Sequence, residues 1–438
     1  MQEALLEETL ASLNPEQSHA VAHITGGWRA QARNVRVSLV DGPPGTGKTW
    51  VAACATAQWL RHNRGQVVIL APTHRACERS ATACRQVGLE QDEVLQLRWG
   101  PTGEPEPGAL TFERAEALPP HLRRKLQGAQ VLVTTWHGAR RALDVSHSPL
   151  IIVDEVSQVP YSGWLALLRR AYEKQPQGFA LIGDPHQLPV VTTQEVLATN
   201  AALGILRRHP ECRPIRLTAQ YRMNGTICAV VNEMRRVGFG GEPLQPANPE
   251  VEGQDLAAVA GGYKQTRTPL DEILNPAAHV VVVDSATLTT RLGLHAEQIG
   301  GSWVHHGEAL LAARLSEEIG SAYGTAVGLA VLSPYAAQAS AMKALGLRNA
   351  MSVFKAQGHE WDCVILSLAR SEIAGRTILD EMYQHTYVGL SRSRSKLVIL
   401  MNVACFRPLR LFGPLLNRIS GLEGGRLVEA DPGWIKHD

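Results

Sequence analysis

Short apolar runs bounded by turn residues recur along the first half of the chain. They occupy residues 35–40, 67–70, 131–133, 150–153 and 180–182. Runs of this length without an alternating polar face are typical of strands that are buried on both sides. Helical spacing of apolar positions appears between them, for example over residues 50–62 and 164–172. The alternation predicts an α/β fold in which helices cover both faces of a parallel sheet.

The same alternation returns in the second half. Apolar runs at residues 280–283, 327–332, 363–368 and 396–401 accompany a helical pattern over 308–319. We therefore expect two α/β domains in tandem, spanning residues 1–210 and 211–438, with their junction in the basic, proline-containing stretch 207–214. Residues 90–120 and 238–276 show little periodicity, so each is predicted to be an insertion or extended loop.

Composition narrows the class of protein. A chain of 438 residues with 45% hydrophobic and 19% charged residues is ordinary for a soluble α/β protein of two to three domains. The net charge of +2 means that any nucleic-acid contact must come from a local groove. Seven cysteines without a C-x-x-C pair predict reduced, mostly buried thiols in a cytoplasmic protein, without a zinc site. No apolar run reaches the ~18 residues of a membrane span, and the glutamate-bearing N-terminus does not resemble a secretory signal.

The stretch DGPPGTGKT at residues 41–49 follows the first apolar run directly. In a G-x-x-x-x-G-K-T loop the glycines let backbone N–H groups curl around phosphates, and the next helix points its positive N-terminus at them. Lys48 is expected to reach the outer phosphates and Thr49 to ligate Mg²⁺. The sequence therefore predicts a protein that uses a nucleoside triphosphate.

Acidic and amide side chains follow two later strands. Asp154 and Glu155 end the run 150–153, where they could hold Mg²⁺ and act as general base for attack on the γ-phosphate. The alternative for this pair is a strand-end cap of the next helix. Gln187, in GDPHQL after the run 180–182, could touch the γ-phosphate or the attacking water, although this segment taken alone could be a plain turn.

Two arginines in the second half are candidates for phosphoryl transfer. Arg222 lies in QYRM and Arg392 in GLSRSR. A guanidinium that reaches the transition state from a second domain accelerates phosphoryl transfer strongly. An isolated arginine is more often a solvated surface residue, so the interpretation depends on the motifs around it.

Ten segments in a fixed order supply that context. They are LNPEQ (13–17), GPPGTGKT (42–49), APTH (71–74), VLVTT (131–135), DEVSQ (154–158), GDPHQLP (183–189), QYRM (220–223), SPYAAQ (333–338), KAQGHEWDCVILS (355–367) and VGLSRSRSKL (388–397). With these motifs the chain resembles a superfamily 1 helicase of the 5′-to-3′ branch, similar to the nonsense-mediated-decay helicase and its bacterial relatives. The resemblance implies two tandem RecA-like domains that use ATP and Mg²⁺.

The resemblance also implies roles in the nucleotide site. Gln17 would read the adenine edge and Tyr221 would stack on the base. Gly358 and Glu360 would contact the γ-phosphate side and the ribose. The phosphate loop would contribute Gly42, Gly45, Thr46, Gly47, Lys48 and Thr49, and the hydrolysis centre would comprise Lys48, Thr49, Asp154, Glu155 and Gln187, completed by Arg222 and Arg392 from the second domain.

Single-stranded nucleic acid would be held mainly by its phosphates, by hydroxyls and backbone N–H groups that carry no sequence preference. The implied contacts are Pro72, Thr73, Thr134 and Thr135 in the first domain, and Pro334, Tyr335, Ser352 and Val353 in the second. Taken alone, the Thr134-Thr135 pair is explained at least as well by β-propensity at a strand end. By analogy with bacterial and phage members, DNA is expected in preference to RNA.

Two functions from different classes fit these observations. The leading one is an ATP-driven translocase that separates duplexes in the 5′-to-3′ direction. The alternative is an ATP-gated subunit that clamps a single strand for a partner such as a nuclease. About a dozen residues precede LNPEQ, so the upstream accessory β-barrel of many family members is expected to be absent, and translocation is better supported than unwinding. A small-molecule kinase would explain neither Arg222, Arg392 nor the QGHE segment.

Overall fold

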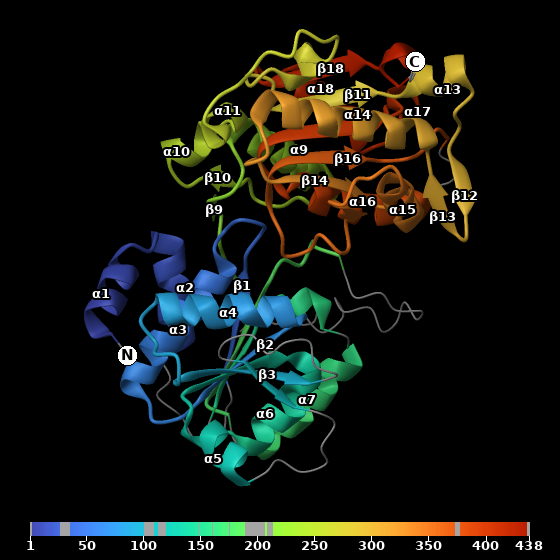
Figure 1. Cartoon of the computed structure of the whole chain (residues 1–438). Helices are drawn as coiled ribbons and strands as arrows, with labels where there is room; N and C mark the ends of the chain where they lie inside the picture. The colour runs from blue at the N-terminus through green and yellow to red at the C-terminus, as the bar shows by residue number, and fades with distance from the viewer. Residues whose placement is uncertain are drawn as a thin grey trace. The chain divides into compact units, whose positions relative to one another are not determined.

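The structure is a computed structural model, and it describes residues 2–26, 36–99, 109–112, 120–147, 149–159, 161–174, 176–188, 206–207, 213–372 and 377–435. The chain divides into two compact units. The first comprises Met1–Pro185 and Pro189–Ala219, and the second His186–Leu188 and Gln220–Asp438. Each unit contains one large sheet flanked by helices (Figure 1). The predicted α/β class, with two tandem units that each hold a parallel sheet flanked by helices, is confirmed.

The sheet of the first unit has the strand order β4-β3-β5-β2-β6-β7-β1-β8, and its strands pair in parallel. Its strands are β1 (Arg36–Asp41), β2 (Val67–Ala71), β3 (Val94–Trp99), β4 (Ala109–Phe112), β5 (Val131–Thr135), β6 (Leu150–Val153), β7 (Gly178–Gly183) and β8 (Ile215–Arg216). All five apolar runs of the first half are strands. Val35, at the start of the first run, lies outside the described residues.

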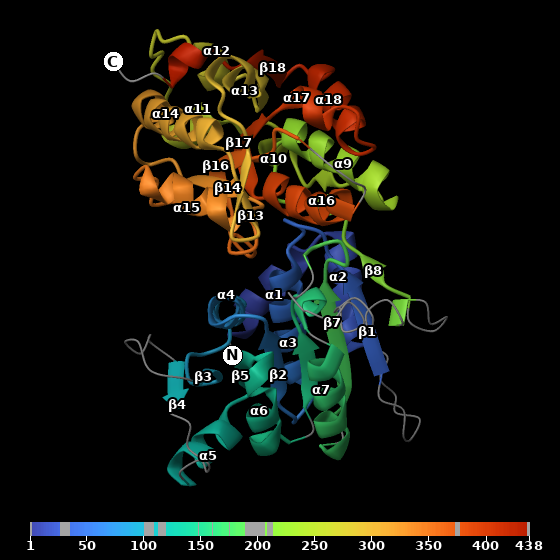
Figure 2. The same cartoon turned by 90° about the vertical axis from the view of Figure 1, so that its right-hand side faces the viewer.

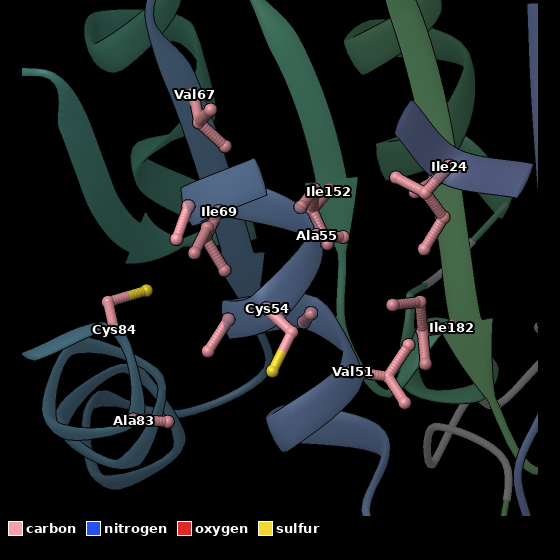
Figure 3. Close-up of a cluster of buried hydrophobic side chains, with 14 of the residues drawn as sticks. Ile24, Val51, Cys54, Ala55, Val67, Ile69, Ala83, Cys84, Ile152 and Ile182 are labelled. Carbon is pink, nitrogen blue, oxygen red and sulfur yellow. The ribbon is translucent and has the colours of Figure 1, made fainter. Parts of the chain in front are cut away.

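Helices cover both faces of this sheet, as the apolar strands require. They are α1 (Glu3–Ala11), α2 (Pro15–Thr25), α3 (Lys48–His62), α4 (His74–Gln86), α5 (Pro120–Gly128), α6 (Ala139–Val145) and α7 (Tyr161–Glu173), with the short 3₁₀ helices η1 (Trp136–Gly138) and η2 (Val156–Gln158). Along β2, Val67 and Ile69 pack with α3 and α4, whereas Val68 and Leu70 pack in a second core with α6 and α7. Figure 3 shows Ile69 in the first of these cores, together with Ile182 beside Val51 of α3.

The loop expected over residues 90–120 requires a correction. Within its described part, β3 pairs with β5 and extends the main sheet, and β4 pairs with β3. Polar residues in β3 hide it from a hydrophobic pattern. Gln96 is buried but donates a hydrogen bond to the His74 carbonyl, and Arg98 forms an ion pair with Glu78 of α4. Because partners satisfy these groups, polar positions are tolerated within the sheet.

The sheet of the second unit has the order β15-β14-β16-β17-β11-β18, and its strands are also parallel. Its strands are β11 (Val280–Asp284), β14 (Leu329–Ser333), β15 (Ala350–Ser352), β16 (Trp361–Ser367), β17 (Ser393–Met401) and β18 (Gly425–Glu429). The four apolar runs of the second half are confirmed as strands. Val280 and Val282 face one core of this unit, and Val281 and Val283 face the other.

The helices around the second sheet are α9 (Gly225–Phe239), α13 (Ala286–Leu292), α14 (His306–Tyr323), α15 (Ala336–Ala344), α16 (Thr377–Leu390), α17 (Val403–Phe406) and α18 (Phe412–Ser420), with the 3₁₀ helix η4 (Pro432–Trp434) (Figure 2). The segment 238–276 is not wholly extended, because it holds β10 (Gln245–Pro246), α10 (Pro249–Glu252), α11 (Leu256–Ala260) and α12 (Asp271–Leu274). Three further short strands, β9 (Ala219–Gln220), β12 (Glu297–Ile299) and β13 (Ser302–Val304), complete the described elements.

Membrane spans, metal-binding groups and cysteines can be assessed for the described residues only. No described helix is both long and apolar enough to cross a membrane. Within the same residues, no group of three or more His, Cys, Asp or Glu side chains could hold a metal ion. Six of the seven cysteines are described, and these six are free thiols, five of them buried. Cys212 lies outside the described residues.

Candidate nucleotide site and nucleic-acid edges

A glycine-rich loop joins β1 to α3 in the first unit. Gly45 and Gly47 have positive φ angles of 81° and 79°, which L side chains rarely adopt. A Cβ atom at Gly42 would lie 2.4 Å from Cγ of Lys48, so the lysine side chain passes directly over this glycine. The loop therefore has the backbone curl that a phosphate cradle needs, and α3 begins at Lys48 itself.

Gln17 lies against this loop. It stands at the third position of α2, where its backbone N–H donates to the Asn14 side chain at 2.8 Å in a capping box. Its amide Nε2 donates to the Thr46 carbonyl at 3.2 Å, and its side chain is buried. The residue expected to read the adenine edge is therefore fixed beside the phosphate loop.

Four side chains meet at the carboxyl ends of β1 and β6. The Thr49 hydroxyl donates to Oδ2 of Asp154 at 3.0 Å, and Lys48 Nζ lies 3.9 Å from Oε1 of Glu155. Burial, and then the neighbouring charge of Glu155, raise the pKa of Asp154. A cation placed between Thr49 and Asp154 would offset that cost, so this pair is suited to hold Mg²⁺.

Glu155 has two unusual properties. Its φ of 51° lies in the left-handed region, and its backbone N–H donates to Oδ1 of Asp154 at 2.9 Å. Its Oε2 is buried and has no hydrogen-bond partner among the described residues. Strained backbone and an unpaired buried oxygen are more typical of a functional site than of a helix cap, because both destabilise the fold. These properties favour the general-base interpretation over the capping alternative.

In the second unit, Glu360 bridges two arginines. Arg222 Nε donates to Oε2 of Glu360 at 2.6 Å, and Arg394 donates to Oε1. Burial alone would raise the pKa of Glu360, but the charges and hydrogen bonds of Arg222 and Arg394 lower it to about 2. Arg222 Nη1 also donates to the Ser391 carbonyl at 3.0 Å. Arg222 is therefore tied to the segment that carries Arg392.

Arg392 itself is almost wholly buried in the second unit. Its guanidinium donates to the carbonyls of Val388 and His359, at 3.1 and 3.3 Å, and to the Ser391 hydroxyl at 3.3 Å. Tyr221 is 43% exposed, and Gly358 has a φ of 78°. Gln187 is buried and is grouped with the second unit. The roles given to these residues stay predictions.

The residues expected to hold nucleic acid all lie at carboxyl ends of strands. In the first unit, Pro72 and Thr73 follow β2, and Thr134 and Thr135 end the neighbouring β5. Thr73 is exposed and caps α4, whereas Thr134 is fully buried and its hydroxyl donates to the Leu97 carbonyl. In this arrangement the whole of Thr134 is buried, its backbone as well as its hydroxyl.

In the second unit, Pro334 and Tyr335 follow β14, while Ser352 ends the neighbouring β15 and Val353 comes directly after it. Tyr335 and Ser352 are partly exposed, but Val353 is fully buried. The predicted contacts thus cluster at one edge of each sheet, and their binding role stays a prediction. Sequence reasoning missed Arg394, although it stands two residues from Arg392, because nothing local indicates that it shares Glu360 with Arg222.

Comparison with known proteins identifies the family. A model described as an AAA domain matches residues 12–236, just over half of the chain, and another AAA-domain model matches residues 202–404. The chain belongs to the AAA-domain family. The P-loop of this family implies use of ATP, which fits the cradle formed by Gly42, Gly47 and Lys48.

Two curated relatives match most of the chain. DNA replication ATP-dependent helicase/nuclease DNA2 of Xenopus laevis is 25% identical over 414 residues, covering 88% of this chain and 36% of that protein. Regulator of nonsense transcripts 1 of Dictyostelium discoideum is 24% identical over 442 residues, covering 87% of this chain and 31% of that protein. The resemblance to superfamily 1 helicases is confirmed. The chain spans about a third of the length of these relatives.

Among solved structures, the helicase nonstructural protein 10 of an arterivirus matches with a TM-score of 0.45 and 15% identity. The match covers 88% of this chain and 61% of that chain.

Proposed function

We propose that this chain is an ATP hydrolase that moves along single-stranded nucleic acid and separates duplexes, in the 5′-to-3′ direction and on DNA. The observation that carries the proposal is the cluster of Lys48, Thr49, Asp154 and Glu155 at the glycine-rich loop. A cradle, a pair suited to a cation and an unpaired carboxylate oxygen are the components that phosphoryl transfer to water requires.

Each residue of the cluster has a distinct task in this proposal. Lys48 places positive charge at the outer phosphates, and Thr49 with Asp154 holds Mg²⁺, which supplies charge neutralisation when it is bound. Glu155 accepts a proton from the attacking water at Oε2, the oxygen for which the described residues provide no hydrogen-bond partner. Arg222 and Arg392 are proposed to stabilise the charge that develops on the phosphates during hydrolysis.

Single-strand binding is proposed for the strand-end residues. The exposed Thr73 and the partly exposed Ser352 offer hydroxyls, which bind phosphates without sequence preference. The direction follows from the motif series, which resembles the 5′-to-3′ branch. DNA is proposed because the relative DNA2 is named for DNA replication, although the other relative is named for transcripts.

Strand displacement tests the proposal directly. Duplexes with a 5′ overhang, a 3′ overhang or blunt ends would be mixed with the protein, ATP and Mg²⁺, and release of a labelled strand would be followed over time. The proposal predicts release from the 5′-overhang duplex alone, on DNA. Release from the 3′-overhang duplex would show movement in the opposite, 3′-to-5′ direction. Strand-stimulated ATP hydrolysis without release would favour the alternative, an ATP-gated subunit that clamps a single strand for a partner such as a nuclease.

A further inference from the structure

A small β-hairpin stands apart from the main sheet of the second unit. Its strands β12 (Glu297–Ile299) and β13 (Ser302–Val304) pair in an antiparallel manner around Gly300 and Gly301, whose φ angles are 56° and 80° (Figure 1). All three residues of β12 are exposed, and Ile299 beside the turn is 53% exposed. The hairpin therefore presents an apolar side chain at its tip that contributes little to the core.

Two hydrogen bonds hold this hairpin, one directly after its turn and one just before β12. The Ser302 hydroxyl accepts from the Ala337 N–H at 3.1 Å, at the start of α15. The Ala296 N–H donates to the Ser371 hydroxyl at 2.9 Å, in the segment that follows β16. The hairpin is therefore held at its turn as well as at its base, while the Ile299 side chain stays exposed.

Trp303 on β13 lies over a buried cation. The guanidinium carbon of Arg370 is 3.9 Å from the centre of the Trp303 ring, and Arg370 is only 2% exposed. Arg370 also donates through Nη2 to the Glu372 carbonyl at 2.8 Å and through Nη1 to the Tyr335 hydroxyl at 3.4 Å. These bonds fix the guanidinium, which in turn fixes the orientation of the partly exposed indole ring.

This cluster lies at the carboxyl edge of the second sheet. Tyr335 follows the end of β14, and Arg370 follows the end of β16. The intervening Ala369 has a φ of 51°, and its N–H donates to Oε2 of the fully buried Glu308 at 2.9 Å. Glu308 thus holds the strained turn that carries Arg370. Arg370 thus contacts both Trp303 and Tyr335, one of the residues predicted to touch nucleic acid.

We propose that the β12–β13 hairpin contacts the bases of the bound single strand, with Trp303 as a stacking surface and Ile299 at its tip. The inference rests on the proposed function, because it names how the strand is held. The hydroxyls at the ends of the β-strands would bind only the phosphates of the nucleic acid. An aromatic ring, in contrast, stacks on any base, which suits a motor without sequence preference. A ring that is already oriented by Arg370 loses little conformational freedom when a base stacks on it.

Binding to strands with and without bases tests this proposal. The full chain would be titrated against a fluorescent oligothymidylate and against a strand of equal length with abasic sites. Trp303→Ala should weaken binding to the base-bearing strand by about tenfold, the order expected for one lost base stack. Trp303→Phe should retain most of the affinity. On the abasic strand, wild type and both variants should bind alike, and the dependence of affinity on salt should be unchanged.

A second variant keeps the test valid if Trp303→Ala fails to fold. Ile299 is exposed, so Ile299→Ser leaves the core intact, and Leu427→Ser on β18, where Leu427 is 41% exposed, is the matched control. Ile299→Ser should weaken binding only to the base-bearing strand, and Leu427→Ser should change neither affinity. If Trp303→Ala does not fold, Ile299→Ser decides alone. Equal losses on both strands, or no loss in any folded variant, would overturn the proposal. A wild-type protein that binds neither strand would instead refute the proposed function.

Discussion

The ion network around Glu360 allows a quantitative prediction. In Glu360→Gln, Arg222 and Arg394 lose the carboxylate that they share. A fall in pKa from 4.5 to about 2 sets an upper bound of ~3.5 kcal/mol on the stabilisation, because one pKa unit corresponds to ~1.4 kcal/mol. Since the Glu360 side chain is 32% exposed, solvent screening reduces the expected loss to ~1–2 kcal/mol.

The sign of its pH dependence follows from the lowered pKa. A carboxyl group whose pKa is lower in the folded state stabilises the fold above its unfolded pKa, and that stabilisation is lost as the pH falls through its folded pKa. The wild type should therefore unfold at higher denaturant concentration than Glu360→Gln at pH 7. The difference should shrink between about pH 4.5 and pH 2.

Denaturant unfolding followed by circular dichroism measures this difference. Glu317→Gln is the matched control, because Glu317 is 69% exposed and pairs with Arg314 at 3.7 Å on the surface of α14. Exposed pairs of this kind contribute little, so the control should unfold like the wild type. Equal midpoints for Glu360→Gln and wild type at pH 7 would refute the assignment of Glu360 as the bridge between the two arginines.

Three further predictions concern the candidate catalytic groups and the thiols. Glu155→Gln should lower ATP turnover by ~10²-fold or more with nucleotide binding retained, measured by steady-state hydrolysis and a fluorescent nucleotide; unchanged turnover would return Glu155 to a capping role. Arg392→Ala should lower turnover by ~10³-fold if its guanidinium stabilises the transition state, whereas a thermal shift without loss of turnover would assign it a structural role. In a Cys212→Ser background, iodoacetamide at pH 8 should modify the native protein far more slowly than the unfolded chain, because burial raises the pKa of Cys54, Cys77, Cys84 and Cys363 to about 12. Rapid alkylation of any of these four thiols in the native protein would contradict the described burial.

The sequence predicted those features that local spacing determines. Every apolar run became a strand because the residues alternate between two buried faces, as Val67 to Leu70 show. The phosphate loop could also be predicted locally, because the glycines, Lys48 and the start of α3 are neighbours in the chain. The strand β3 was missed because Gln96 and Arg98 have partners that only the folded structure supplies.

Features that join distant segments could not be read from spacing. Glu360 binds Arg222, which lies 138 residues away, and Arg370 lies under Trp303 of a separate hairpin. No pattern in either segment specifies the other, because such contacts arise from the order of strands in the sheet. The strain at Glu155 and Ala369 is likewise invisible in a sequence, since both positions hold residues that usually adopt negative φ angles.

The measurement that tests the central claim most directly is steady-state ATP hydrolysis with and without single-stranded DNA, for wild type and Lys48→Ala. Lys48 lies over Gly42 in the phosphate loop, so its truncation removes the cradle's charge. We expect single-stranded DNA to stimulate ATP hydrolysis by the wild type. Folded Lys48→Ala should show no hydrolysis above background, with or without DNA. Wild-type hydrolysis that single-stranded DNA does not stimulate, or a Lys48→Ala variant that hydrolyses ATP normally, would contradict the account.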